Sequence, residues 1–354
     1  MKILYGVQGT GNGHITRARA MAKAFKEKNL DVQFLVSGRT KLDLFDMEPF
    51  GAYWWREGLT FRSKKGRVVL SETVVKSKPF QLAQDIRDLD VSGFDLIVTD
   101  YEPITAWAGK QAGIKVIGLG HQYAFNERIP RVKMTLIDKM VLNSFAPADI
   151  ELGLHWHHFD SPILPPIAPV HEVHSMRTDY TLVYLPFEAP DEICSLLRHF
   201  NHSKFVVYHP EKPTGLADNI LWRAPSRISF PADLAACSGV ICNAGFELAS
   251  EALQLGKKIL VKPLAKQIEQ RCNALALETL GWGSSMNQLS AGVVRNWLHH
   301  GHAVTVDYPD TASVVAEFIA QGGDGDRNKL VEALWSETRF PVEKKLEDQR
   351  RLAA

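Results

Sequence analysis

The chain has 354 residues, a formal net charge of +1 and 45% hydrophobic residues, which are typical of a globular protein with a large core. This composition excludes disordered and collagen-like chains, and the near-neutral charge argues against a protein that holds long nucleic acid through many phosphates. The four cysteines lack CxxC spacing, so they indicate neither a disulfide framework nor a zinc cluster. Without a signal-peptide pattern or a run of about 18 apolar residues, we expect a cytoplasmic protein of two domains.

Short β-rich runs alternate with segments of helical period along both halves of the chain. This alternation predicts an α/β fold with parallel sheets covered by helices on both faces. Residues 151–178 are rich in proline and show little helical period, so they indicate a crossing segment. We therefore expect Rossmann-like domains at 1–165 and 166–325 and a charged, solvated helical tail at 326–354. The expected strands are 2–7, 32–36, 95–99, 115–119, 180–185, 204–208, 239–242 and 259–262.

The first glycine loop, GTGNGH, follows the first strand and ends at His14. Glycines at this corner let a ligand approach main-chain N–H groups, so Gly11, Asn12 and Gly13 are candidates to line a cleft. A dinucleotide fingerprint would need glycine at position 14, and a phosphate-binding P-loop would need Gly-Lys-Ser/Thr after the glycines. His14 itself is suited to remove a proton from a hydroxyl group, because imidazole titrates near neutral pH.

The helix after this loop has an apolar stripe that includes Ile15, Ala18 and Phe25. Arg17 and Arg19 lie outside this stripe, so the pattern predicts an amphipathic helix with these arginines off its apolar face.

Other polar residues follow the later strands of the first half. Asp100 and Glu102 come at the end of the third expected strand, and His121 follows the fourth. The carboxyl ends of parallel strands face a common crevice, so these side chains are expected to converge with His14. Capping of the following helix is the alternative role for Asp100 and His121.

The second motif, ICNAGFELASEAL, spans residues 241–253. It predicts a buried strand, a glycine turn at Gly245 and a helix that ends at Gly256. The N-terminus of such a helix suits a diphosphate, and the carboxylate of Glu251 suits ribose hydroxyls. After the next strand, Gln267, Glu269 and Gln270 offer amide and carboxylate groups for the hydroxyls of a sugar.

Together, the two regions resemble GT-B glycosyltransferases, specifically MurG-like transferases of the family 28 type, which carry a GTGGH-type loop near the start. The resemblance covers the whole chain in order. It implies two doubly wound Rossmann-like domains facing across a cleft, with a nucleotide-sugar donor, usually UDP-linked, on the second domain and an acceptor on the first. It also implies synthesis of cell-envelope polysaccharide and no bound metal or cofactor.

The resemblance also implies roles for individual residues of the second half. Gly245 and Phe246 would contact the diphosphate through their backbone, and Glu251 would bind ribose. Glu269 and Gln270 would hold the donor sugar. Arg223 lies where such transferases form a base-binding loop.

These features favour an inverting transfer in which His14 or Asp100 removes the proton of an acceptor hydroxyl. The acceptor would be a glycan, a lipid-linked sugar or a small molecule. A UDP-sugar 2-epimerase on the same fold is one alternative, and a non-catalytic nucleotide-sugar-binding protein is another. The second alternative arises from Glu247, an acid beside the expected diphosphate where relatives often carry Ser, Thr or Asn.

Two further segments are open to a functional interpretation. The run HWHH at 155–158 has imidazoles without a neighbouring acid or cysteine pattern, so it does not indicate a metal site. Residues 128–145 mix basic and apolar side chains. A core-facing helix with a charged outer side is favoured there, and peripheral contact with the inner face of a membrane is the alternative.

Overall fold

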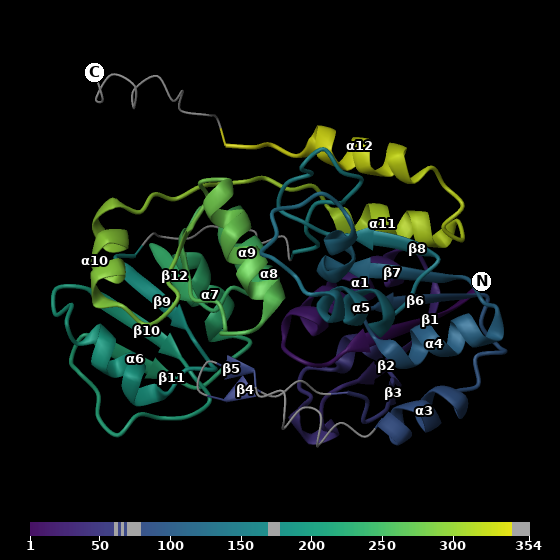
Figure 1. Ribbon diagram of the computed structural model, residues 1–354, viewed down its shortest axis with the longest axis horizontal. Helices are drawn as coiled ribbons and strands as arrows, with labels where there is room; N and C mark the ends of the chain where they lie inside the picture. The colour runs from purple at the N-terminus through teal and green to yellow at the C-terminus, as the bar shows by residue number, and fades with distance from the viewer. Residues whose placement is uncertain (60–62, 65–66, 69–78, 169–177, 342–354) are drawn as a thin grey trace.

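The computed structural model describes residues 1–59, 63–64, 67–68, 79–168 and 178–341. Two six-stranded sheets lie side by side, each made of parallel strands with helices against its faces (Figure 1). Residues 169–177 of the expected crossing segment and residues 342–354 of the expected tail lie outside the described part of the chain.

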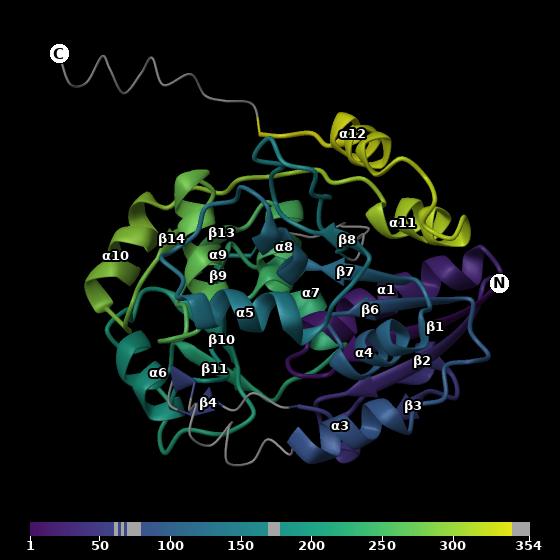
Figure 2. The same ribbon diagram turned by 45° about the vertical axis from the view of Figure 1, so that its right-hand side comes forward.

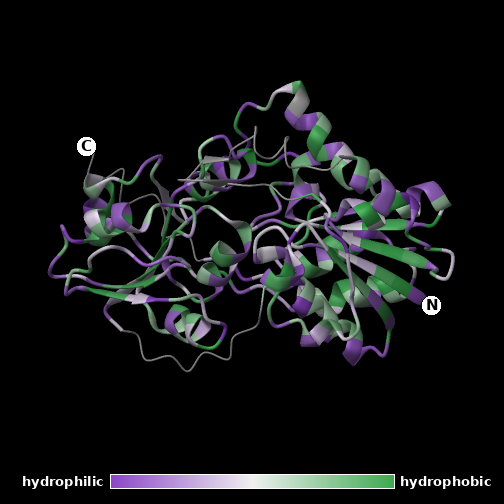
Figure 3. Ribbon diagram, turned by 90° about the horizontal axis from the view of Figure 1, so that it is seen from below, coloured by the Kyte–Doolittle hydropathy of each residue, from purple (hydrophilic) through white to green (hydrophobic). Residues whose placement is uncertain are grey.

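The first sheet has the order β3-β2-β1-β6-β7-β8. Its central strand β1 is buried from Ile3 to Gln8, and the strands are largely hydrophobic (Figure 3). Two short strands, β4 (Ser63–Lys64) and β5 (Arg67–Val68), form a separate antiparallel pair. The other elements are β1 (Lys2–Gln8), α1 (Gly13–Glu27), β2 (Asp31–Ser37), β3 (Trp54–Trp55), α3 (Pro79–Arg87), β6 (Leu96–Asp100), α4 (Pro103–Ala112), β7 (Val116–Gly120), α5 (Leu136–Phe145) and β8 (Ile150–Gly153), with short 3-10 segments at Lys41–Asp43, Glu48–Phe50 and His121–Asn126.

The second sheet has the order β11-β10-β9-β12-β13-β14 and repeats the plan of the first. Its elements are β9 (Tyr180–Tyr184), α6 (Pro190–Leu197), β10 (Lys204–Tyr208), β11 (Ile220–Arg223), α7 (Ser229–Ala236), β12 (Gly239–Cys242), α8 (Phe246–Gln254), β13 (Lys258–Val261), α9 (Ile268–Thr279), β14 (Ser284–Ser285) and α10 (Ala291–His300). Each of the eight strands expected from the sequence is present within a few residues of its expected bounds. The two-sheet α/β fold is therefore confirmed.

The last two helices return to the first half of the molecule (Figures 1 and 2). Helix α11 (Thr311–Ala320) packs on α1, where Lys28 Nζ lies 2.9 Å from Glu317 Oε2. Helix α12 (Arg327–Glu337) follows it, and Trp335 Nε1 donates to the carbonyl of Ile163 at 2.6 Å. Residues 311–320, which the expected division assigns to the second domain, thus lie against the first. The solvated tail was expected to include α12, but this helix packs on the protein instead.

Within the described ranges, no helix combines the length and the apolar character needed to cross a bilayer.

Candidate active site

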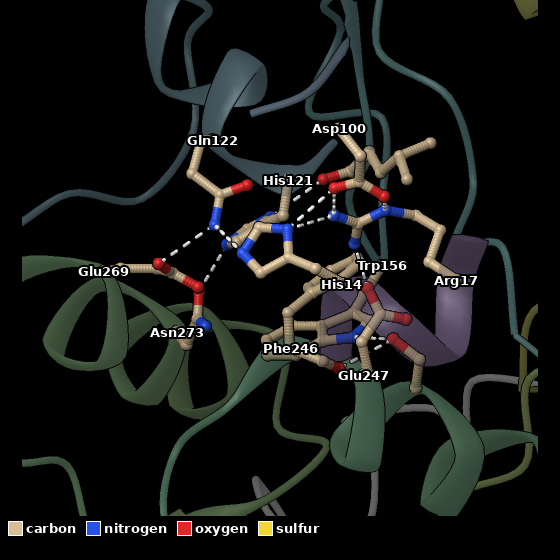
Figure 4. Close-up of polar contacts among 12 residues, drawn as sticks. His14, Arg17, Asp100, His121, Gln122, Trp156, Phe246, Glu247, Glu269 and Asn273 are labelled. Carbon is tan, nitrogen blue, oxygen red and sulfur yellow. Dashed lines mark hydrogen bonds and ion pairs between the residues drawn. The ribbon is translucent and has the colours of Figure 1, made fainter. Parts of the chain in front are cut away.

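His14 and Asp100 meet where α1 begins and β6 ends. His14 Nδ1 lies 2.7 Å from Asp100 Oδ1, and the aspartate is fully buried whereas the histidine side chain is 14% exposed (Figure 4). Because the carboxylate accepts the hydrogen bond, Nδ1 carries the proton and the lone pair is on Nε2. The sequence expectation that these two residues converge is therefore met by the geometry, and the arrangement leaves Nε2 as the basic atom.

Arg17 lies one helical turn after His14 and is buried, although the sequence pattern placed it outside the apolar face. Its Nε donates to Asp100 Oδ2 at 2.9 Å, and its Nη2 also contacts Asp100 Oδ1. Burial alone would raise the pKa of Asp100, but Arg17 and His14 hold that pKa below its usual value. Asp100 therefore stays ionised. The spacing of three residues from His14 was the signal that sequence analysis missed.

Helix α8 begins at the boundary between the two halves. Gly245 is its N-cap, no described side chain caps its first turn, and a Cβ added at Gly245 would meet no described atom within 4 Å. Phe246 is buried, with its ring stacked 4.1 Å from that of His121 and 5.2 Å from that of Trp156. The aromatic stack fixes the start of the helix. The region next to the Cα of Gly245, where a side chain would lie, is unfilled.

Glu247 points away from that space and toward α1. Its Oε1 accepts a hydrogen bond from Arg17 Nη1, and a Cβ added at Gly13 would lie only 2.8 Å from its Cγ. Burial raises the pKa of Glu247 to about 8, against the lowering effect of Arg17. The acid is thus turned from the helix N-terminus where a diphosphate was expected.

Gln122 joins the two halves beside Nε2 of His14. Its Nε2 donates to Glu269 Oε2 at 3.2 Å and lies 3.5 Å from His14 Nε2. Gln122 is buried, and its Oε1 has no hydrogen-bond partner among the described residues. The sequence placed Gln122 beside His121 at a strand end without assigning it a role, so it was missed.

The two halves thus bring the His14–Asp100 pair close to the start of α8, a helix of the second half. A family model described as glycosyl transferase family 1 matches residues 1–300. The chain belongs to this family. The protein is therefore a glycosyltransferase. A comparison with the curated proteins finds no match.

Solved glycosyltransferase structures share the fold over almost the whole chain. The calicheamicin glycosyltransferase CalG4 has a TM-score of 0.56 at 14% identity, covering 100% of this chain and 98% of that one. The spinosyn rhamnosyltransferase SpnG, complexed with thymidine diphosphate, has a TM-score of 0.55 at 15% identity, covering 99% and 100%. SnogD from Streptomyces nogalater has a TM-score of 0.51 at 13% identity, covering 94% and 96%. These likenesses show the GT-B fold.

Two residues expected in the cleft of this glycosyltransferase are engaged elsewhere. Glu102 is fully buried and caps α4, accepting hydrogen bonds from the backbone of Ile104 and Thr105 and from the hydroxyls of Ser37 and Thr105. His121 is also buried, with Nδ1 2.8 Å from the Leu154 carbonyl and Nε2 2.6 Å from Asn273 Oδ1. Burial lowers the pKa of His121. Both side chains are therefore engaged in buried structural contacts next to the site.

Two residues expected to bind the donor also stabilise the fold of the second half. Gln270 Oε1 accepts the backbone N–H of Leu264 at 2.9 Å, which fixes the loop before α9. Arg223 ends the edge strand β11, and its Nη1 lies 3.0 Å from Asp233 Oδ2. The structure does not bring Arg223 into the contacts around His14.

The remaining expected residues surround the starts of α1, α8 and α9. Gly11 has a φ of +83° and faces open space, and Asn12 Nδ2 lies 3.5 Å from Tyr184 OH across the two halves. Glu251 lies one turn after Glu247 on α8 and raises the pKa of that residue. Gln267 precedes α9, and its Oε1 is buried with no hydrogen-bond partner in the described structure. Their ligand-binding roles stay predictions.

The histidine run contributes to packing. His155 Nδ1 accepts the backbone N–H of Trp156, and burial lowers the pKa of His155 well below its ordinary value. His157 and His158 stack on each other and lie beside Phe340. Across the described ranges, no group of three His, Cys, Asp or Glu side chains is arranged to hold a metal ion.

The capping role of Glu102 gives the first prediction. Glu102→Ala removes every acceptor at this cap and leaves the Ser37 and Thr105 hydroxyls without it. We expect the free energy of unfolding, measured in urea, to fall by about 2 kcal/mol or more, with donor affinity of the folded protein unchanged. Glu102→Gln keeps one acceptor oxygen and should lose less. A Glu102→Ala variant of normal stability with no transferase activity would instead place Glu102 in the reaction.

Proposed function

We propose that this protein transfers a sugar from a nucleoside-diphosphate donor to an acceptor hydroxyl with inversion and without a metal ion. His14 Nε2 removes the hydroxyl proton, and the acceptor oxygen attacks the anomeric carbon. The bond from that carbon to the diphosphate oxygen breaks, and the leaving group takes the electron pair. Asp100 stabilises the imidazolium that forms on His14.

The start of α8 is the proposed diphosphate site. Its first-turn N–H groups and the positive end of the helix dipole would stabilise the negative charge of the departing diphosphate. The open space at Gly245 leaves room for this group, and Glu247 is turned toward Arg17. Glu269 enters from α9 and would hold the donor sugar.

The proposal is carried by one observation, the meeting of both halves at His14 Nε2. Gln122 lies within 3.5 Å of this nitrogen and contacts Glu269 at 3.2 Å, so a sugar held by Glu269 would lie close to the base. Proximity of this kind supplies much of the rate enhancement in group transfer.

The MurG-like motifs favour a UDP-linked donor and a role in cell-envelope polysaccharide synthesis. SpnG, which shares the fold, is complexed with thymidine diphosphate, another pyrimidine nucleotide. A donor panel should therefore contain both UDP- and TDP-sugars.

The second prediction tests the base. His14→Ala should lower turnover by about 100-fold to 10,000-fold, because general-base assistance is worth that much. Donor affinity, measured by calorimetry, should change little, since His14 contacts the acceptor proton. His299→Ala, at an exposed histidine of α10, is the matched control. Unchanged turnover in His14→Ala would remove His14 from the mechanism.

Incubation with donor alone separates the rival functions. A 2-epimerase converts its UDP-sugar without an acceptor, whereas a transferase requires an acceptor hydroxyl for transfer. A non-catalytic protein would bind the donor tightly and show no turnover with any acceptor in the panel.

We also propose peripheral membrane contact through α5. This helix packs on the first half through Leu142 and Phe145, but its outer side exposes Leu136, Met140 and Val141 at 84%, 62% and 45%. The exposed side thus carries apolar residues as well as charge. Basic side chains at Lys133 and Lys139 are exposed beside them, a combination that suits an anionic lipid surface.

The third prediction concerns this surface. A protein with Leu136→Ser and Met140→Ser should sediment less with anionic phosphatidylglycerol vesicles than the wild type, by about 10-fold in apparent affinity, because each lost side chain removes buried apolar area. Leu216→Ser, at an exposed apolar residue in a loop of the second half, is the control. Equal binding of all three proteins would contradict a role for α5.

A further inference from the structure

A buried charge cluster links the two halves through Arg17. The guanidinium is 2% exposed and contacts Asp100 through Nε and Nη2 in its own half. Through Nη1 it contacts Glu247 on α8 of the other half (Figure 4). A guanidinium is planar and rigid, so a partner at one edge restricts the orientation of the other edge. Glu247 therefore helps to orient the group that holds Asp100.

The same guanidinium lies beside the proposed base. Nη2 is 3.0 Å from His14 Nδ1, the nitrogen that Asp100 contacts at 2.7 Å. A rotation of Arg17 would therefore disturb both the carboxylate and the ring that it orients. Neither the family motifs nor the sequence pattern assigned a role to this arginine.

The contact with Glu247 depends on close approach of the two halves. Gly13 has no side chain at the point where a Cβ would lie 2.8 Å from Glu247 Cγ. Glu247 is buried by this approach, and its Oε2 has no hydrogen-bond partner in the described structure. Separation of the halves would expose the carboxylate to water and remove its contact with Arg17.

Two carboxyl groups, those of Asp100 and Glu247, share one guanidinium in this cluster. The pKa of Asp100 is held below its usual value, whereas burial raises that of Glu247 to about 8. The titratable groups facing Glu247 are Arg17 on α1, Asp100 on β6, Tyr5 on β1 and Glu251 on α8 itself. Glu247 is thus the carboxyl of the pair that keeps a proton near neutral pH.

We propose that Arg17 is a positioning residue that aligns Asp100 and His14 when the two halves close, and that Glu247 is the group that holds it in place. The alignment of a catalytic base rests on the proposed function, whereas the closing contact does not. Glu247 serves this purpose best as a neutral carboxyl, because its Oε1 still accepts the arginine N–H and no second negative charge is buried.

The sign of the pH dependence follows from the two states. In separated halves, Glu247 faces water and ionises near its ordinary pKa of about 4.3. In the closed protein its pKa is about 8. At any pH between about 4.3 and this value, Glu247 therefore takes up a proton when the halves close. The stabilisation of the closed state is therefore complete below the lower value and is lost as the pH rises through about 8.

The fourth prediction uses Glu247→Gln, which keeps an acceptor oxygen for Arg17 and cannot ionise. At pH 9, one unit above the pKa of about 8, the wild type should lose about tenfold in kcat/KM relative to pH 7. Glu247→Gln should keep near wild-type activity at pH 7 and retain it at pH 9. Glu247→Ala removes the contact, so it should lower kcat at both pH values with little change in donor affinity.

The matched control is Glu317→Gln, which neutralises a carboxylate of α11 paired with Lys28, the residue that follows the end of α1. This variant should follow the wild-type pH profile. A merely structural role for Glu247 predicts parallel profiles for the wild type and Glu247→Gln, and parallel profiles would overturn the proposal.

X-ray scattering tests the closing contact without a transfer assay. The radius of gyration of the wild type should increase between pH 7 and pH 9.5, whereas that of Glu247→Gln should stay constant. An equal change in both proteins, or no change in either, would overturn the inference. If no variant transfers sugar under any condition, the proposed function fails, while the scattering result still decides the role of Glu247.

Discussion

The geometry around His14 depends on the burial of one guanidinium between the carboxylate of Asp100 and the carboxyl group of Glu247. Charges removed from water are costly unless they are paired and hydrogen-bonded, and removal of one partner typically costs about 3–5 kcal/mol. Arg17 meets this requirement by contacting Asp100 with two of its nitrogens and Glu247 with the third. The cluster therefore orients Asp100 and His14 and resists separation of the halves.

Aromatic packing gives this polar contact a fixed position. Phe246, the first residue of α8, stacks on His121 from the 3-10 segment after β7 and on Trp156 from the segment after β8. Trp156 Nε1 donates to Ser250 one turn further along α8, at 2.9 Å. Asn273 then joins His121 to the Ala244 carbonyl, directly before the helix. These contacts fix the start of α8, so Glu247 is presented to Arg17 in one orientation.

Much of the fold was predictable because hydrophobic patterns report burial directly. The eight expected strands are apolar runs and are all present. Of the other strands in the two sheets, β3 and β14, with two residues each, carry too little pattern to detect, and the four-residue edge strands β8 and β11 were also missed. The return of α11 to the first half was not predictable, since it depends on contacts between distant residues such as Lys28 and Glu317. Sequence patterns reveal which faces are apolar, but not which half covers them.

The site was predictable in part for a related reason. His14 and Asp100 were expected together because strand ends and helix starts share one edge of a parallel sheet. The same rule placed Glu102 there, but a polar residue at a strand end can also cap the next helix, and Glu102 does so. Arg17 was assigned outside the apolar face because arginine is seldom buried. Only the position of its two carboxylate partners, one of them 230 residues away, makes its burial favourable.

The acid at the start of α8 joins these observations. A carboxylate beside a proposed diphosphate site would repel the donor in an open protein. In the structure, Glu247 is turned onto Arg17, and burial raises its pKa to about 8. The closed arrangement thus moves the acid away from the helix N-terminus and reduces its charge in the same step. A residue that would oppose donor binding in isolation thereby becomes part of the contact that orients His14, the proposed base.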